Sequence, residues 1–571
     1  MSARAASVTT AGITPELFPE QFVRTSSRAL VVAALALFVV AGFSFRAFRL
    51  GAESLSEDEL NKVRAVAEYR EHGLTPANGE HPFLMKAMLE VTIVAAGAWN
   101  TTAFVHNNPR LQVSTETAAR LPGALFGALT ALLIFLVASE LFGAEVGLLA
   151  AALWAFDPAA IGFNRIAKED TFLLFFFLLA NIFWLRGQRV AEEGSRRPEP
   201  FYWATAAAFG AMLASKYIPH YIAISASYYY IFQGAPATRW RVGKLKWIVF
   251  FTIMGLTFVA CNPTILLPGT WHEMRVFARE GRIGHDAYEF MGHLYRNQMT
   301  LWLEGSPWYF YYVFMLVKLP VAVTLGFVAG LPLLFKKRLG DGRYFLLFWL
   351  FYWFFPFTFM GGKFTRYVTF ILPAVLLTSA IGIHWAATRL AQLLPRARFD
   401  EARRAYVRAS LALVVVALSA YASVSAAPHY RLYTNFIGGG PSRAGDYFPH
   451  DEFYDASTHD VAVALARLAP RTGARVASET PELVAYYARL AGREDLRTVS
   501  LSDRAALEEL QAGDCIVVVR GRRYFSNDEL TSRLSAASQP SATIALGEVP
   551  SARIYVLDAD SLSVVKDVLR R

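Results

Sequence analysis

Apolar positions in the first three quarters of the chain gather into long runs, separated by short polar stretches. Most runs are about as long as the roughly 18 to 20 residues that a helix needs to cross the hydrocarbon core of a bilayer. We therefore expect an α-helical polytopic membrane protein. The runs predict about eleven spans, at 28–48, 118–139, 146–163, 170–186, 200–215, 217–233, 247–267, 308–335, 344–361, 367–389 and 407–427.

The connecting loops predict the orientation, because cytoplasmic loops of membrane proteins carry an excess of Lys and Arg. If the chain begins inside, the interior loops are "RGQRVAEEGSRRPEP", "RWRVGKLK", "FKKRLGDGR" and "RLAQLLPRARFDEARRAYVR", and all four are basic. This agreement requires the nearly continuous runs on either side of "ASKYIPHY" to be two separate spans. It places residues 1–27 in the cytoplasm and everything after 427 on the exterior side.

Composition supports this class of protein, since 54% of the residues are apolar and only 18% are charged. The net charge of +10 is largely explained by the basic loops, so we attribute it to the membrane topology and not to a surface that binds nucleic acid. Cys261 falls within a span and Cys515 in an expected strand, so no disulfide is expected. No Cys/His spacing indicates a zinc site, and residues 1–27 lack the layout of a cleaved signal.

The chain changes character after the last span, where Gly438, Gly439, Gly440 and Pro441 mark a turn or linker. Beyond it, "HDVAVALARLA", "TPELVAYYARLAG" and "DRAALEELQAG" predict helices that alternate with strands at "GARVASE", "DLRTVSL" and "DCIVVVR". This alternation predicts a small α/β domain with a partly parallel sheet at 428–571, following a transmembrane domain at 28–427. The tail lacks a Gly-rich phosphate loop, which favours a structural or acceptor-recognition role.

Two exterior loops, 49–117 and 268–307, are too long to be simple connections. The first predicts two helices, "DELNKVRAVAEYREHG" with Leu60, Val63 and Ala67 on one face, and "HPFLMKAMLEVTIVAAGAWN". Both suit helices that lie along the membrane surface. Ser56 and Glu59 have the spacing of a capping box at the start of the first helix.

The uncommon polar groups of the bundle fall on the exterior side of this topology. They are Asp58, Glu59, His81, Lys86, Arg120, Asn164, Arg165, Lys168, Glu169, Asp170, Lys216, His285, His293, Arg296, Lys363 and Arg366. Ionisable residues at membrane depth are functional candidates by default. Each also has a structural explanation: the arginines at span ends can snorkel, Asp170 can cap a helix or pair with Arg165, and His81 can be a turn residue.

The combination of carboxylates and cations at one membrane mouth suits transfer of a sugar from a lipid phosphate. A carboxylate can take the proton from an attacking hydroxyl, while Lys and Arg stabilise the charge that builds on the departing phosphate. The lipid tail would lie in the bilayer, which explains why such an enzyme needs a membrane bundle.

Several motifs resemble the protein O-mannosyltransferase and lipid-A aminoarabinose transferase group, the polyprenyl-phosphate-sugar-dependent glycosyltransferases with the type C fold, and specifically its bacterial members. They occur in the family's order between about residues 50 and 375. Phe83 stands where the family's His-Pro-Pro-Leu-x-Lys motif has its second Pro, which bears on the sugar and acceptor that fit. The matching positions are Asp58-Glu59, His81 to Lys86, Arg120 in "AARLPGAL", Arg165 with Asp170, "SKY" around Lys216, and "GKFTRYVTFILP" around Arg366.

The resemblance implies inverting transfer from a polyprenyl-phosphate-linked sugar, most simply mannose, without a nucleotide sugar and with no metal implied by the visible ligands. It assigns Asp58 as general base, with Glu59 in support. It predicts that the donor phosphate is bound by Arg120, Arg165, Lys86, Lys216 and Arg366, with His81, Lys168 and Asp170 as supporting residues. The expected location is a bacterial plasma membrane, with the active site and the C-terminal domain on the periplasmic side.

Two alternatives stay open at this point. The acceptor is either a hydroxyl of an exported protein or that of a glycolipid or cell-wall glycan, and the family supports both. A non-catalytic flippase or transporter for lipid-linked sugars is the alternative of another class. Transporters usually place charges near the midplane and show repeated halves, and neither feature is found in this sequence.

Overall fold

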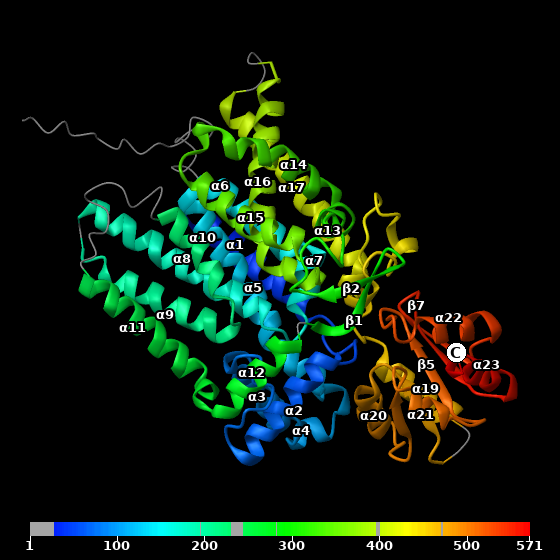
Figure 1. The fold of residues 1–571 in the computed structure, drawn as a ribbon. Helices are drawn as coiled ribbons and strands as arrows, with labels where there is room; N and C mark the ends of the chain where they lie inside the picture. Colours follow the sequence, from blue (N-terminus) through cyan, green and yellow to red (C-terminus); the bar gives the residue numbers. More distant parts are fainter. Residues whose placement is uncertain are drawn as a thin grey trace, which may run out of the picture.

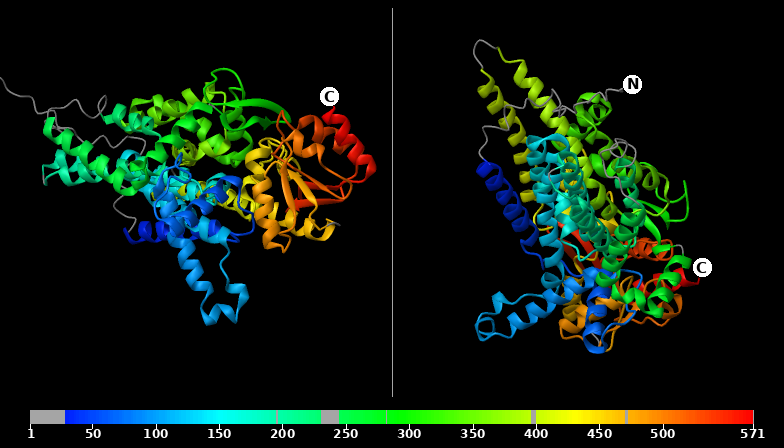
Figure 2. Two further views of the ribbon diagram at one scale, coloured as in Figure 1. Left: turned by 60° about the horizontal axis from the view of Figure 1, so that its bottom comes forward. Right: turned by 90° about the vertical axis from the view of Figure 1, so that its left-hand side faces the viewer.

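A computed structural model describes residues 28–194, 196–229, 244–280, 282–395, 400–469 and 472–570. Helices of the bundle run along a common direction, with the C-terminal sheet domain and the first exterior loop at the same end (Figures 1 and 2). The bundle helices are α1 Arg28–Ala47, α5 Thr115–Phe142, α6 Ala144–Phe156, α7 Pro158–Asn164, α8 Asp170–Glu193, α9 Glu199–Ser215, α10 Ile222–Ser227, α11 Lys244–Cys261, α13 Phe310–Lys318, α14 Val321–Gly330, α15 Gly342–Phe359, α16 Val368–Gln392 and α17 Glu401–Ala426.

Five helical segments in the described parts of the chain are long and apolar enough to cross a membrane. They contain α1, α5, α8, α16 and α17, one in each segment. A sixth span results if α6 and α7 count as one helix, which bends by 61° at Asp157 and Pro158. By this criterion the predicted count of eleven is not confirmed. One reason is that prolines divide the apolar runs, as Pro320 does between α13 and α14. The expected span at 217–233 contains the short α10, and its end from residue 230 lies outside the described residues.

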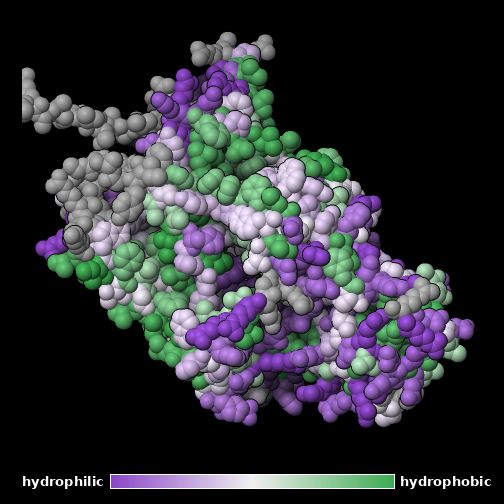
Figure 3. All heavy atoms as spheres, viewed as in Figure 1, coloured by the Kyte–Doolittle hydropathy of each residue, from purple (hydrophilic) through white to green (hydrophobic). Residues whose placement is uncertain are grey.

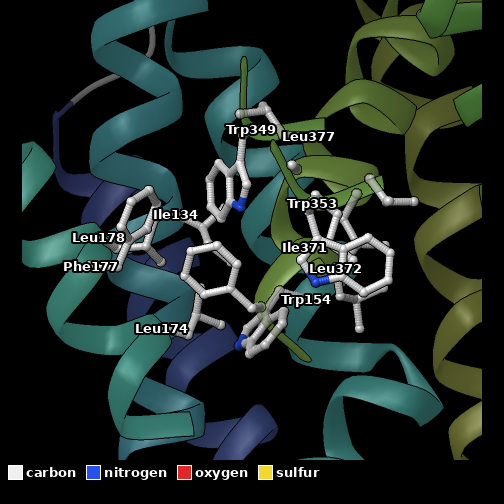
Figure 4. Close-up of a cluster of buried hydrophobic side chains, with 14 of the residues drawn as sticks. Ile134, Trp154, Leu174, Phe177, Leu178, Trp349, Trp353, Ile371, Leu372 and Leu377 are labelled. Carbon is white, nitrogen blue, oxygen red and sulfur yellow. The ribbon is translucent and has the colours of Figure 1, made fainter. Parts of the chain in front are cut away.

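The bundle packs around α16, and 89% of an apolar 18-residue stretch of the segment that contains this helix is buried. Ile371 and Leu372 of this helix lie beside large rings from α6 and α15, among them Trp154, Trp349 and Trp353 (Figure 4). The outer helices instead present apolar side chains outwards, so that green surface covers much of the bundle and polar surface gathers at the end with the C-terminal domain (Figure 3). This distribution is that of a helical membrane bundle.

The first exterior loop contains α2 Glu57–His72, α3 Phe83–Asn100 and α4 Ala103–His106. The helix α2 lies between the bundle and the C-terminal domain and packs against both. Leu60 packs with Ala462 and Leu483, whereas Val66 packs with Met85 of α3. The predicted Ala67 is exposed. The helix α3 projects from the molecule and does leave apolar residues such as Val91 exposed (Figure 2).

The second exterior loop forms α12 Pro268–Glu280 and an antiparallel hairpin, β1 Arg282–Phe290 and β2 His293–Gln298, which the sequence analysis did not predict. Hairpin residue Tyr288 donates a hydrogen bond to Asp451 of the C-terminal segment over 2.6 Å. The hairpin therefore connects the bundle to the tail.

The C-terminal segment confirms the predicted alternation of helices and strands. Its sheet has the order β4-β3-β5-β7-β6, in which β4, β3 and β5 are parallel and the last two strands are antiparallel. The elements are α18 Pro449–Phe453, α19 Thr458–Leu468, β3 Arg475–Ser478, α20 Pro481–Leu490, β4 Arg497–Ser500, α21 Arg504–Glu508, β5 Cys515–Val519, α22 Asp528–Ala537, β6 Ala542–Leu546, β7 Val549–Val556 and α23 Ala559–Leu569.

Candidate active site

A cavity of about 800 Å³ lies where the bundle, the first exterior loop and the C-terminal segment meet. Its polar wall comes from the start of α2, the turn between α7 and α8, the end of α9 and the 3₁₀ turn Thr365–Tyr367. Of the sequence-predicted site residues, those that line it are Asp58, His81, Lys168, Asp170, Lys216 and Arg366. Those that do not are Glu59, Lys86, Arg120 and Arg165.

Asp58 lies in the first turn of α2, and the start of that helix is fixed by the predicted capping box between Ser56 and Glu59. Its Oδ2 atom is 2.5 Å from Nζ of Lys168 and 4.0 Å from a guanidinium nitrogen of Arg366. The hydroxyl of Tyr454 donates a hydrogen bond to the same oxygen over 2.9 Å. With 38% of its side chain exposed, Asp58 is accessible from the cavity. Glu57 also lines the cavity and is 45% exposed, but it is paired with Arg522 and not with the cations of the bundle.

The surrounding cations keep this carboxylate ionised. Burial alone would raise the pKa of Asp58, but the charges of Lys168, Lys62 and Arg366 outweigh burial and hold it well below its usual value. Burial lowers the pKa of Lys168 to about 8, although Asp58 acts against that shift. The pair is therefore charged at neutral pH.

A second carboxylate, Glu169, is buried behind Asp58 and is held by Lys62 and His81. Its Oε1 atom is 3.1 Å from Nζ of Lys62 and 3.5 Å from Nδ1 of His81. Burial lowers the pKa of His81 well below its ordinary value, so the ring is neutral at neutral pH despite the nearby carboxylate. These contacts make His81 a support for the turn 166–169 that carries Lys168.

Two further cations face the cavity from the bundle. Lys216, at the end of α9, lies 2.6 Å from Oδ1 of Asp170 and 5.1 Å from the ring centroid of Tyr367. The guanidinium of Arg366 lies 4.2 Å from the ring centroid of Phe364. Aromatic faces stabilise such cations without neutralising them, so both groups retain charge for an anionic ligand.

Glu59 differs from its neighbour because all of its contacts are internal. Its carboxylate accepts hydrogen bonds from Nε and Nη2 of Arg120, both over 2.8 Å, and from the backbone N–H groups of Ser56 and Ala167. Arg120 also donates to the carbonyl oxygens of Leu50, Glu53 and Ser54. Glu59 and Arg120 therefore hold the start of α2 and do not line the cavity, and the catalytic and phosphate-binding roles expected for them stay predictions.

Arg165 and Lys86 also have internal contacts and lie outside the cavity lining. Arg165 donates to the carbonyl oxygens of Phe45, Arg46, Phe48 and Arg49, which lie at and just beyond the C-terminal end of α1. Such carbonyls lack partners within a helix and carry partial negative charge. The Nζ of Lys86 donates to the carbonyl oxygens of Ala77, Asn78 and His81. Burial lowers the pKa of Lys86 to about 7.

Sequence reasoning missed Lys62, Tyr454 and Arg522. Lys62 had a detectable signal, because it follows Asp58 by four residues and so lies on the same helical face. Tyr454 and Arg522 reach the cavity only through the packing of the C-terminal segment on α2. Tyr454 adopts a left-handed backbone conformation, with φ 45°, which is costly for a residue with a large side chain and aims its hydroxyl at Asp58.

The remaining candidates divide between the cavity and structural roles. His285 lines the cavity and contacts Arg522. Lys363 is buried and donates to the carbonyl oxygen of Ser306 over 2.7 Å, while His293 and Arg296 lie in β2 outside the cavity lining. Within the described ranges, no group of three or more His, Cys, Asp or Glu side chains is placed to hold a metal ion.

One protein-family model matches part of the chain. Residues 102–264 match the model of the dolichyl-phosphate-mannose-protein mannosyltransferase family, a segment that includes Lys168 and Lys216 of the cavity. Comparison with curated protein sequences gives no match.

Solved structures of similar fold include an oligosaccharyltransferase from Archaeoglobus fulgidus tethered with an acceptor peptide. The two chains are 12% identical over 86% of this chain and 69% of the other, with a TM-score of 0.50. ArnT from Cupriavidus metallidurans bound to undecaprenyl phosphate is 14% identical over 93% of this chain and 98% of the other, with a TM-score of 0.47. The Pmt1-Pmt2 complex of S. cerevisiae bound to the sugar donor is 18% identical over 46% and 35%, with a TM-score of 0.30.

The match over 102–264 and the shared architecture give the chain the type C fold, which is that of membrane glycosyltransferases. The fold class expected from the sequence, a helical membrane bundle of this type with a small C-terminal α/β domain, is thereby confirmed. The resemblance to polyprenyl-phosphate-sugar-dependent enzymes is supported by the family match over 102–264.

Proposed function

We propose that this protein transfers a sugar from a polyprenyl-phosphate donor to an acceptor hydroxyl at the cavity beside Asp58. The observation that carries the proposal is the contact of an accessible carboxylate, Asp58, with Lys168 and Arg366 in a cavity that Lys216 also lines. A general base and cations for a departing phosphate are the two groups that such a transfer needs.

The donor phosphate is held by Lys168, Lys216 and Arg366 in this proposal. These cations face the cavity, whereas Arg120, Arg165 and Lys86 have their donors occupied by carbonyl and carboxylate oxygens elsewhere. A phosphate between Lys168 and Arg366 replaces part of their contact with Asp58. The charge of Lys168 is the largest electrostatic cause of the low pKa of Asp58, so its engagement by phosphate makes the carboxylate a stronger base.

The lipid part of the donor has an apolar path beside these cations. Apolar side chains line the cavity from α12 and α15 and from the segments that flank the membrane, namely Met274, Phe277, Met299, Phe357 and Met360. A polyprenyl chain that leaves the cavity along these residues stays next to the apolar surface of the bundle.

Transfer follows a single displacement at the anomeric carbon. The acceptor oxygen forms a bond to that carbon while the bond to the phosphate oxygen breaks, and the acceptor proton passes to Asp58. The polyprenyl phosphate leaves with the bonding electron pair, and its added negative charge is stabilised by the neighbouring cations. Attack from the face opposite the leaving group inverts the anomeric configuration.

Mannose is the donor sugar that we propose, with a hydroxyl of an exported protein as acceptor. The match to dolichyl-phosphate-mannose-protein mannosyltransferases supports both choices. We further propose that the cavity opens on the periplasmic side of a bacterial inner membrane, in keeping with the basic loops at the opposite end.

The test compares wild type with Asp58→Asn, purified in detergent and supplied with radiolabelled polyprenyl-phosphate mannose and an exported-protein acceptor. We expect transfer by wild type and a loss of about 10²- to 10⁴-fold in Asp58→Asn. Glu68→Gln, at an exposed position of the same helix, is the matched control and should retain activity.

Three outcomes would contradict parts of the proposal. Equal transfer by wild type and Asp58→Asn removes Asp58 from the mechanism. Transfer by wild type only to a glycolipid or glycan replaces the protein acceptor. Absence of transfer with several donor sugars and acceptors, together with movement of the lipid-linked sugar between leaflets, favours a flippase.

A further inference from the structure

A second cavity, of about 750 Å³, lies in the C-terminal segment beyond the active-site cavity. It forms where the parallel strand β5 ends, between β7, α22 and the tip of the β1–β2 hairpin. We call it the arginine cavity, because its lining includes Arg443, Arg520, Arg522, Arg523 and Arg553. The carboxyl ends of parallel strands are where open α/β sheets commonly bind ligands.

The lining contains five arginines and two carboxylates, Glu289 and Asp446. Arg522 and Arg523 also pair with Asp455 and Asp528 outside the lining, so the positive charge available to a ligand comes from the other three arginines. Arg443 and Arg520 share the single carboxylate of Asp446, at 3.0 Å and 2.8 Å. Arg553 is exposed, and no ion pair joins it to another of the residues that the structure describes. Guanidinium groups in this arrangement retain donors for a carboxylate or phosphate.

The other lining groups suit a saccharide. Val518, Pro550 and Ala552 give an apolar floor, and the hydroxyl-bearing Ser532 and Ser535 of α22 lie beside it. Pockets that combine an apolar surface with a few placed polar groups are typical of small polar ligands. Peptides commonly bind by extending a sheet edge, but the lining includes no residue of the edge strands β4 and β6.

The arginine cavity borders the active-site cavity through Arg522, which lines both. The loop that carries Arg522 is held close to α18, since a Cβ atom at Gly521 would lie 2.4 Å from the carbonyl oxygen of Pro449. With φ 85°, Gly521 also has a backbone conformation that favours glycine. The two cavities are therefore held in a fixed position relative to each other.

We propose that the arginine cavity binds an acidic saccharide unit, bearing a carboxylate or phosphate, that the acceptor protein carries near the hydroxyl that reaches Asp58. This inference rests on the proposed glycosyl transfer for its link to catalysis, but the binding event itself needs no donor. It makes the C-terminal domain a determinant of acceptor choice.

The experiment measures binding of a glucuronic acid-containing disaccharide to the purified full chain by titration calorimetry, with its uncharged glucose counterpart as comparison. We expect wild type to bind the acidic disaccharide at least about tenfold more tightly, because a charge-assisted hydrogen bond is lost in the neutral sugar. The double variant Arg443→Gln, Arg553→Gln should lose this preference. Arg533→Gln, whose arginine pairs with Glu529 on the same helix outside the lining, should retain it.

Asp58→Asn should bind the acidic disaccharide like wild type, which separates this inference from the proposed transfer. Absence of transfer by wild type, with binding of the acidic disaccharide intact, counts against the proposed reaction alone. Equal binding of the acidic and neutral sugars, or unchanged binding by the double variant, overturns the inference. Tighter binding of inorganic phosphate or of an acidic peptide overturns the saccharide assignment.

Discussion

Two charged clusters lie side by side at the exterior end of the bundle, and consecutive residues of α2 belong to them. Asp58 faces the cavity with Lys168 and Arg366, and 38% of its side chain is exposed. Glu59 points the other way and is fully occupied by Arg120 and backbone N–H groups. Both carboxylates have lowered pKa values, each because nearby cations outweigh the effect of burial.

The difference shows that residue type and a shifted pKa do not by themselves identify a catalytic group. Arg120 and Arg165 donate to carbonyl oxygens around the end of α1 and the loop after it, so they hold the first exterior loop in place. Arg366 and Lys216 instead lie over aromatic rings at a cavity. Access to a cavity is therefore what separates the proposed catalytic cluster from the structural cluster.

The largest expected effect concerns the structural cluster. Arg120→Ala leaves the carboxylate of Glu59 buried without its counter-ion, which should lower the free energy of unfolding by about 3–5 kcal/mol. Thermal unfolding of the detergent-solubilised protein measures this loss. Arg110→Ala, at an exposed position, is the control. An unchanged unfolding midpoint with lost transfer would instead assign Arg120 to the donor site.

Arg366→Ala tests the catalytic cluster, because it removes a cation near the departing phosphate. We expect kcat/KM to fall by about 10²- to 10³-fold, the usual effect of losing one group that stabilises developing negative charge. The unfolding midpoint should stay close to that of wild type. Arg338→Ala, exposed at the opposite end, should keep full activity. A comparable loss in that control would show that the measured effect is not specific to the cavity.

Tyr454→Phe asks whether the C-terminal segment contributes to the same cluster. The change removes the hydrogen bond to Asp58 while it retains the ring, so kcat/KM should fall by about tenfold. Tyr406→Phe, exposed on α17, provides the comparison. Full activity of Tyr454→Phe would limit the role of this segment to packing.

Lys168→Gln should shift the pH dependence of kcat/KM for sugar transfer. Since the charge of Lys168 lowers the pKa of Asp58, its removal raises that pKa. Transfer by wild type is lost only as the pH falls through the low pKa of Asp58, so the acid limb of kcat/KM should lie at higher pH in the variant. Lys336→Gln, exposed near the other end, should leave the limb in place. An unmoved limb in Lys168→Gln would show that another group titrates.

The sequence predicted much of the fold because local signals agreed with the final packing. The alternating pattern after residue 458 predicted three helices and three strands that the structure contains, and "SEDE" predicted the capping box of α2. The antiparallel strands β6 and β7 and the hairpin β1–β2 were missed. The break between α6 and α7 follows from Pro158, whose ring removes a helical hydrogen bond.

The candidate site was only partly predictable, because the direction in which a side chain points depends on tertiary packing. Sequence placed Asp58, Lys168, Lys216 and Arg366 on one side, and the structure brings them to one cavity. The family resemblance assigned the base to Asp58, but the pattern of residues did not predict that Glu59 is held by Arg120, more than sixty residues away. Tyr454 was not predictable for the same reason, as its contact with α2 joins residues 396 positions apart.

The most direct test of the account measures sugar transfer and thermal unfolding for Asp58→Asn and Glu59→Gln in parallel. The account predicts that Asp58→Asn loses transfer by about 10²-fold or more and keeps a near-normal unfolding midpoint. It predicts that Glu59→Gln lowers the midpoint but retains most transfer per folded molecule. The reverse pattern, with active Asp58→Asn and a stable but inactive Glu59→Gln, would contradict the assignment of Asp58 as the base.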